Sequence, residues 1–238
     1  TVRNAPGCNA PAVAQYVFAT IARWMEGKPM SPCELTLGVV GVGNVGKIIV
    51  RWARNLGFNV LECDPPRQRA EVGSFVSLDE IARTADIITF HTPLNREGID
   101  RTFHLADSKF LENLGRCRLL INSSRGEVVD NAALLRALEN GSLEAAAVDC
   151  WENEPDIDRR LLDKVFVATP HIAGYSAEGK TRATAMALEA FEEFYGVTVA
   201  GKPVAEAPKL GADVSSLTQI AVTYNPLDDT ATLRRSPE

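Results

Sequence analysis

The chain has 238 residues, of which 45% are hydrophobic and 24% are charged, and its net charge is -6. These values are ordinary for a soluble globular protein with a sizeable core, and an acidic chain without a basic stripe argues against nucleic-acid binding. No apolar run approaches the roughly 18 residues of a membrane span. The five cysteines are an odd number without a Cys-x-x-Cys pair, so we expect no disulfide framework, no metal and a reducing, cytoplasmic compartment.

Apolar strands and helices alternate along most of the chain. The predicted helices run from about Asn9 to Met25, from about Asn44 to Leu56, from a capping box at Ser77 and Glu80, over Asn131–Asn140 after a cap at Asp130, and from about Ser176 to Tyr195. The predicted strands are Leu35–Gly41, Asn59–Cys63, Ile87–Thr92, Leu119–Ser124, Ala145–Cys150, Val165–Thr169 and, more weakly, Leu217–Tyr224. Fully apolar strands between amphipathic helices predict an α/β fold, a Rossmann-type doubly wound parallel sheet.

A glycine-rich turn follows the first predicted strand and opens a helix: Gly41, Val42, Gly43, Asn44, Val45, Gly46. Such a turn lets a pyrophosphate approach the backbone at a helix N-terminus, and predicts a dinucleotide site. Asp64 ends the next strand, where a carboxylate accepts hydrogen bonds from the adenosine ribose and repels a 2′-phosphate, so NAD is favoured over NADP. Alternatively, Asp64 is only a turn residue before Pro65 and Pro66. Even if Asp64 binds the ribose, the nearby Arg67 would weaken the exclusion of NADP.

Three chemically suited residues follow three predicted strands: Arg125, Glu154 and His171. A guanidinium can hold a substrate carboxylate in two hydrogen bonds. Removing a hydride from a carbon that bears a hydroxyl requires the hydroxyl proton to leave, a task suited to a histidine paired with a carboxylate. Taken singly, each residue has an ordinary alternative: a surface cation, an acid in a solvated loop and a structural histidine. We expect His91 and Cys8 to be structural.

Several segments together resemble the D-2-hydroxyacid dehydrogenases: Gly41–Gly46, Ile121–Gly126, Asp149–Pro155 and Thr169–Gly174. The resemblance implies that Arg125 binds the substrate carboxylate, that His171 is the acid/base and that Glu154 is its partner. It also implies further NAD-site residues, namely Thr92, Ser124, Arg125, Asp149 and Gly174 beside the glycine turn and Asp64.

Other segments resemble a family member that acts on a phosphorylated four-carbon 2-hydroxy acid in pyridoxal 5′-phosphate synthesis: Ala5–Ala10, Cys63–Arg67, Phe90–Leu94, Val128–Leu135 and His171–Tyr175. Tyr175 matches a substrate-contacting position, and otherwise packs at a helix start. The resemblance implies oxidation at C2 with NAD. Two alternatives stay open: a relative acting on another 2-hydroxy acid, such as 3-phosphoglycerate, and an NAD-sensing corepressor of the same fold that need not turn over.

The resemblance also implies a domain plan. Residues 1–30 would lead from a substrate domain whose N-terminal segment is missing, 31–174 would form the NAD-binding domain, and 175–198 would return to the substrate domain. Residues 199–238 would begin a C-terminal dimerisation domain, so the protein is expected to be a homodimer. On this plan the chain as written binds NAD but turns over poorly unless completed.

Overall fold

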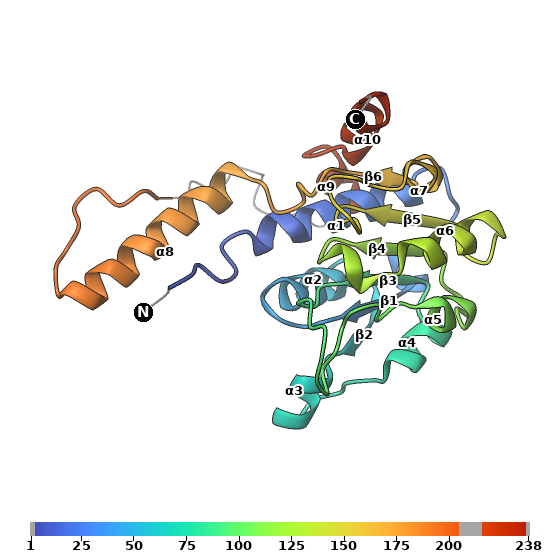
Figure 1. The fold of residues 1–238 in the computed structure, drawn as a ribbon, viewed down its shortest axis with the longest axis horizontal. Coiled ribbons are helices and arrows are strands. Elements are labelled where there is room, and N and C mark those ends of the chain that lie inside the picture. Colours follow the sequence, from blue (N-terminus) through green and yellow to red (C-terminus); the bar gives the residue numbers. More distant parts are fainter. Residues whose placement is uncertain (1–2, 205–215, 237–238) are drawn as a thin grey trace.

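The computed structural model describes residues 3–204 and 216–236. Its centre is one parallel sheet with the strand order β2-β1-β3-β4-β5-β6. The strands are β1 (Thr36–Val40), β2 (Asn59–Cys63), β3 (Ile87–Phe90), β4 (Leu119–Asn122), β5 (Ala145–Val148) and β6 (Val167–Ala168). The predicted parallel sheet and its six strands are confirmed, with most strands ending earlier than predicted (Figure 1).

Ten α-helices surround or extend from the sheet in the described ranges: α1 (Ala10–Met25), α2 (Asn44–Asn55), α3 (Pro65–Ala70), α4 (Leu78–Thr84), α5 (Ser108–Glu112), α6 (Asn131–Glu139), α7 (Arg159–Lys164), α8 (Ala177–Tyr195), α9 (Leu217–Ala221) and α10 (Pro226–Arg235). The predicted starts of α4 and α6 are confirmed, because the side chains of Ser77 and Asp130 accept hydrogen bonds from Glu80 N and Ala133 N. The sequence analysis does not predict the short helices α3, α5, α7 and α10.

Two hydrophobic cores lie on opposite faces of the sheet. On one face, α1 and α2 pack against alternate strand residues, among them Leu37, Ile87 and Ile121. On the other face, α4 to α7 cover the remaining strand residues, among them Ile88 and Leu120. Burial on both faces explains why the strand sequences are continuously apolar.

The weak prediction of a strand over Leu217–Tyr224 is wrong, because this segment begins with helix α9. Ile220, Ala221 and Tyr224 follow Leu217 by three, four and seven positions, which places all four on one face of a helix. Ile220 is buried in the same core as α1, and the Tyr16 and Tyr224 rings lie 6.1 Å apart. Packing on α1 therefore decides the helical conformation.

The C-terminal helix α10 covers the edge of the sheet. Ala168 N of β6 donates to Thr230 Oγ1 at 3.0 Å, and Arg234 donates to Val165 O at 2.6 Å. The unpaired edge of β6 is thereby partly closed. In the predicted dimerisation segment, residues 205–215 and 237–238 lie outside the described residues.

Helix α8 projects away from the sheet beside the N-terminal segment (Figure 1). Arg182 Nε of α8 donates to Cys8 O at 2.8 Å, and the only buried residue of the helix is Gly179. Phe191, Phe194 and Tyr195 are exposed on it. No helix in the described ranges has both the length and the apolar character that crossing a membrane requires.

Candidate active site

A cleft of about 520 Å³ lies at the carboxyl ends of the strands, where open α/β sheets bind their ligands. It is lined by Gly7, Asn9, Val13, Gly43, Asn44, Val45, His91, Thr92, Pro93, Ser123, Ser124, Arg125, Asp149, His171, Gly174 and Tyr175. Most of the predicted site residues thus share one cleft. The sequence analysis assigns no site role to Gly7, Asn9 and Val13, although the first two fall in a segment that carries the family resemblance.

The three glycines of the turn differ in their surroundings. Gly41 has φ +88°, and a Cβ there would lie 2.8 Å from the His91 backbone. A Cβ on Gly46 would lie 2.2 Å from Gly41 O, so the start of α2 packs directly on the turn. A Cβ on Gly43 would meet nothing within 4 Å. Gly41 and Gly46 are therefore required by the fold, whereas Gly43 leaves open backbone facing the cleft.

Asp64 caps α3 and also contacts the glycine turn. Its Oδ1 accepts from Arg67 N at 3.0 Å, and its Oδ2 accepts from Val42 N at 2.8 Å. Asp64 therefore joins the end of β2 to the first turn of the site. A carboxylate has about four acceptor positions, so these two bonds leave capacity for ribose hydroxyls.

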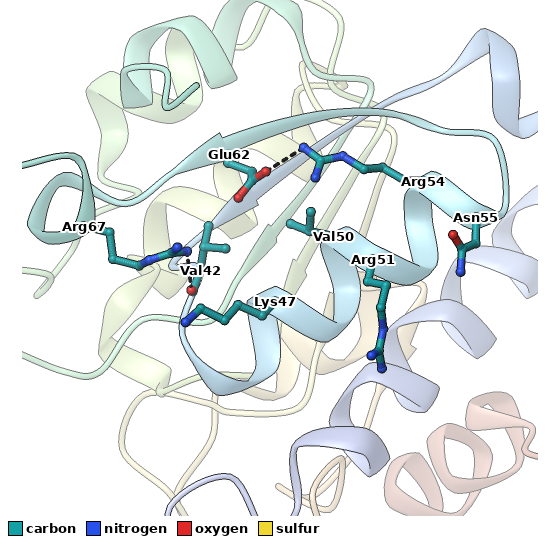
Figure 2. Close-up of a pocket in the computed structure, with 8 residues that line it drawn as sticks. All are labelled: Val42, Lys47, Val50, Arg51, Arg54, Asn55, Glu62 and Arg67. Atoms are coloured by element: carbon teal, nitrogen blue, oxygen red, sulfur yellow. Dashed lines mark hydrogen bonds and ion pairs between the residues drawn. The ribbon is translucent and has the colours of Figure 1, made fainter. Parts of the chain in front are cut away.

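A basic groove lies beside Asp64 on the outer side of the turn. Figure 2 shows Lys47, Arg51 and Arg54 of α2 opposite Arg67, with the ends of Lys47 and Arg67 near Val42. Arg67 donates to Val42 O at 2.9 Å and pairs with Glu71, while Arg54 pairs with Glu62 at 2.7 Å. Arg67, which lies next to the Asp64 carboxylate, offsets part of its repulsion of a 2′-phosphate.

His171 and Glu154 form a close pair. His171 Nδ1 lies 2.8 Å from Glu154 Oε2, while Glu154 Oε1 accepts from Trp151 N at 2.7 Å. Because an ionised carboxylate only accepts hydrogen bonds, Nδ1 carries the proton and Nε2 is the basic nitrogen. The His171 side chain is 46% exposed and lines the cleft, with Glu154 behind it.

Asp149 anchors the loop that carries His171. Its buried carboxylate accepts from Thr169 Oγ1 at 2.6 Å, Ile172 N at 2.8 Å and Ala173 N at 3.0 Å. His171 N donates to Asp149 O at 2.8 Å. Burial raises the pKa of the Asp149 carboxyl, and these hydrogen bonds oppose that rise. Asp149 is predicted from the sequence as an NAD-site residue alone, and the geometry adds this anchoring role.

Arg125 is exposed in the cleft beside His171. Its Nη1 donates to Ser124 O at 2.6 Å, and Asn122 Nδ2 donates to Arg125 O at 3.0 Å. The guanidinium is therefore held at the end of β4. Tyr175 is 72% exposed, with Lys180 Nζ 3.7 Å from its ring centre.

The polar atoms of the cleft fit a polar ligand. Three buried side-chain atoms in the described part of the chain have no hydrogen-bond partner and belong to residues that line the cleft: His91 Nδ1, Thr92 Oγ1 and Ser123 Oγ. Buried polar groups of folded proteins nearly always have partners, so these atoms favour a bound molecule with hydrogen-bonding groups. Burial lowers the pKa of His91 to about 3, so its ring is neutral. The described residues contain no cluster suited to a metal ion.

Comparison with known proteins identifies the family of the chain. Residues 17–173 match the D-isomer specific 2-hydroxyacid dehydrogenase, NAD binding domain. The chain is 44% identical to the erythronate-4-phosphate dehydrogenase of Bacteroides thetaiotaomicron over 99% of its own length and 68% of that protein. It is 50% identical to the enzyme of that name from Proteus mirabilis over 81% of its length and 52% of that protein.

Solved structures share the fold. A D-2-hydroxyisocaproate dehydrogenase is 20% identical with a TM-score of 0.66, covering 82% of this chain and 69% of that one. A D-lactate dehydrogenase from Aquifex aeolicus is 24% identical with a TM-score of 0.60, covering 84% and 71%. The family resemblance seen in the sequence is confirmed: this chain belongs to the D-isomer specific 2-hydroxyacid dehydrogenases, as an NAD-dependent oxidoreductase that contains their NAD-binding domain.

Proposed function

We propose that the protein oxidises 4-phospho-D-erythronate at C2 to the 2-oxo acid with NAD, a step that belongs to pyridoxal 5′-phosphate synthesis. The observation that carries the proposal is the His171–Glu154 pair, 2.8 Å apart, in the same cleft as Arg125. The names of the relatives from Bacteroides and Proteus supply the substrate.

Each of the three residues has a separate task. Arg125 binds the substrate carboxylate and fixes which face of C2 is presented. His171 takes the hydroxyl proton at Nε2, and Glu154 holds the Nδ1 proton and stabilises the imidazolium. The Gly41–Gly46 turn, Asp64, Thr92, Ser124, Asp149 and Gly174 would hold NAD, which would supply the hydride acceptor when bound.

Tyr175 would contact the substrate at the mouth of the cleft, which its exposure supports. The exposed aromatic residues of α8 support a role for residues 175–198 as a connection to a substrate domain, with residues 1–30 as the incoming connection. We further propose that the protein works as a homodimer in the cytoplasm, in accord with five free cysteines.

The test is NADH formation by the full-length protein with 4-phospho-D-erythronate or 3-phospho-D-glycerate. A secondary electron acceptor is added so that slowly released NADH does not limit turnover. A higher kcat/KM for the four-carbon acid supports the proposal. A higher kcat/KM for the three-carbon acid would contradict the assigned substrate but not the roles assigned to the catalytic residues. No turnover with either acid, despite NAD binding, would favour the non-catalytic corepressor.

A further inference from the structure

A second histidine–glutamate pair lies beside the first. His104 Nε2 is 2.6 Å from Glu152 Oε1, and Glu152 stands two residues before Glu154 on the loop that follows β5. The His104 ring stacks on Phe103 with centres 4.1 Å apart. His104 is not among the residues that line the cleft, so the proposed proton transfer does not explain this pair.

Two further hydrogen bonds, both with Asn131, hold Glu152. Its Oε2 accepts from Asn131 N at 2.9 Å, and its own N–H donates to Asn131 Oδ1 at 3.2 Å. Its side chain is only 18% exposed. Both carboxylate oxygens are therefore occupied, and the loop is fastened to the start of α6 on one side and to His104 on the other.

The backbone around the two pairs is unusual. In the described ranges, the residues other than glycine with positive φ are His104 (50°), Asn153 (61°) and His171 (57°). These are the two histidines and the residue between the two glutamates. Left-handed conformations are unfavourable for residues with a side chain and persist where surrounding contacts enforce them. Their grouping indicates that the two pairs form one constrained unit.

The connection to the first pair runs through Trp151. Trp151 N donates to Glu154 Oε1, and Trp151 Nε1 donates to Thr169 O at 2.9 Å. A Cβ on Gly126 would lie 1.8 Å from Trp151 O, so the segment after Arg125 packs directly on this backbone. Fixing Glu152 therefore fixes the neighbouring peptide that orients the Glu154 carboxylate.

We propose that His104 is a positioning residue: with Glu152 it holds the loop so that Glu154 stays aligned with His171. Its effect on turnover rests on the proposed function, while its effect on the His171–Glu154 hydrogen bond does not. Other charged groups lie near the ring: Asp130 Oδ2 is 3.9 Å from His104 Nδ1, and Arg96 and Arg101 lie over the Phe103 ring on which His104 stacks. Small displacements of a catalytic group cost up to about 10²-fold in rate.

The kinetic test uses three variants of the full-length protein. His104→Ala should lower kcat about tenfold or more with an unchanged KM for NAD, because it leaves the cofactor cleft intact. His104→Gln should restore most of the rate, because its amide can donate to Glu152. Arg136→Ala is the control, because it removes the exposed 2.9 Å Arg136–Ser108 hydrogen bond near the same segment and should have no effect. Equal losses in all three variants would overturn the proposal.

A double-mutant cycle separates positioning from general destabilisation. If His104 acts through Glu154, adding His104→Ala to Glu154→Gln should cost little further activity per folded molecule. Losses that multiply would overturn the proposal.

If no turnover is found, a measurement without substrate can still test whether His104 keeps Glu154 aligned with His171. The His171 Nδ1 proton, assigned by its loss in His171→Ala, should give a low-field ¹H resonance. In His104→Ala this resonance should shift or broaden, whereas in His104→Gln it should be retained. An unchanged resonance in His104→Ala would contradict the inference, whereas an inactive wild-type protein would contradict only the proposed function.

Discussion

The site is built from two regions, one formed mainly by backbone and the other mainly by side chains. At the Gly41–Gly46 turn the backbone forms the site, because the glycines have no side chains to fill the space around it. At the His171 loop the side chains form the site, and Asp149, Glu152 and Glu154 hold the backbone in place.

This difference has a consequence for substitutions. A change in the turn should act on cofactor affinity or on folding, because the turn offers only shape and backbone N–H groups. A change in the loop should act on rate, because the loop sets the position of the proton acceptor.

The largest effect is expected for His171→Ala. Loss of the general base should lower kcat by about 10³-fold, because such groups contribute about 10²–10⁴. NADH affinity, measured by fluorescence titration, should stay within about twofold of wild type, since His171 is not part of the turn. A comparable loss of NADH affinity would break the separation between the two regions.

The turn can be tested with two matched glycine substitutions. Gly46→Ala places a Cβ 2.2 Å from a backbone oxygen and should lower the free energy of unfolding by about 2–3 kcal/mol. Gly43→Ala meets no atom, so its unfolding curve in urea should match wild type. Its NADH Kd should instead rise about tenfold, because the methyl group occupies the approach of the pyrophosphate. Equal unfolding curves for both variants would contradict the assigned roles.

Cofactor choice is expected to depend on the charge of Asp64. Asp64→Asn removes the charge and keeps one acceptor oxygen, so it can cap Arg67 N but loses the hydrogen bond from Val42 N, and the free energy of unfolding should fall by about 1–2 kcal/mol. The ratio of kcat/KM for NADP to that for NAD should rise about tenfold, helped by Lys47 and Arg67. Adding Arg67→Ala should reverse part of the gain. An unchanged ratio would leave Asp64 as a helix cap only.

The smallest effect concerns acid stability. The pKa of His91 is about 3 in the folded protein against an ordinary value of 6.5, so the unfolded chain binds the extra proton between these values. The stability contributed by the neutral ring is therefore complete above pH 6.5 and is lost as the pH falls below it. Between pH 6.5 and 5.5, wild type should lose about 1 kcal/mol more than His91→Gln in urea unfolding. Parallel losses would show that His91 is protonated in the folded state.

The sheet, the glycine turn and two helix starts could be predicted from the sequence, because the residues that determine each of them are close together along the chain. Continuous apolar strands, the glycine turn and the Ser77 and Asp130 caps each lie within a few residues. The strand predicted over Leu217–Tyr224 is wrong although its apolar residues have a helical spacing, because eight residues give too short a pattern and packing on α1, far away in the sequence, decides the conformation.

The loop contacts were missed for the same reason. His104 and Glu152 are 48 residues apart, and neither has a neighbour in the sequence that marks the pair. The anchoring role of Asp149 likewise depends on hydrogen bonds across 20 residues or more. Such roles follow from the three-dimensional arrangement and not from residue type.

The most direct test of the proposed hydride transfer from C2 to NAD is deuterium transfer from 4-phospho-D-erythronate labelled at C2. The full-length protein is incubated with this acid and NAD, and the reduced cofactor is analysed by mass spectrometry, with His171→Ala as the control. We expect one deuterium in the reduced cofactor formed by wild type and almost no reduced cofactor with His171→Ala. Reduced cofactor without deuterium, or equal yields from the two proteins, would contradict it.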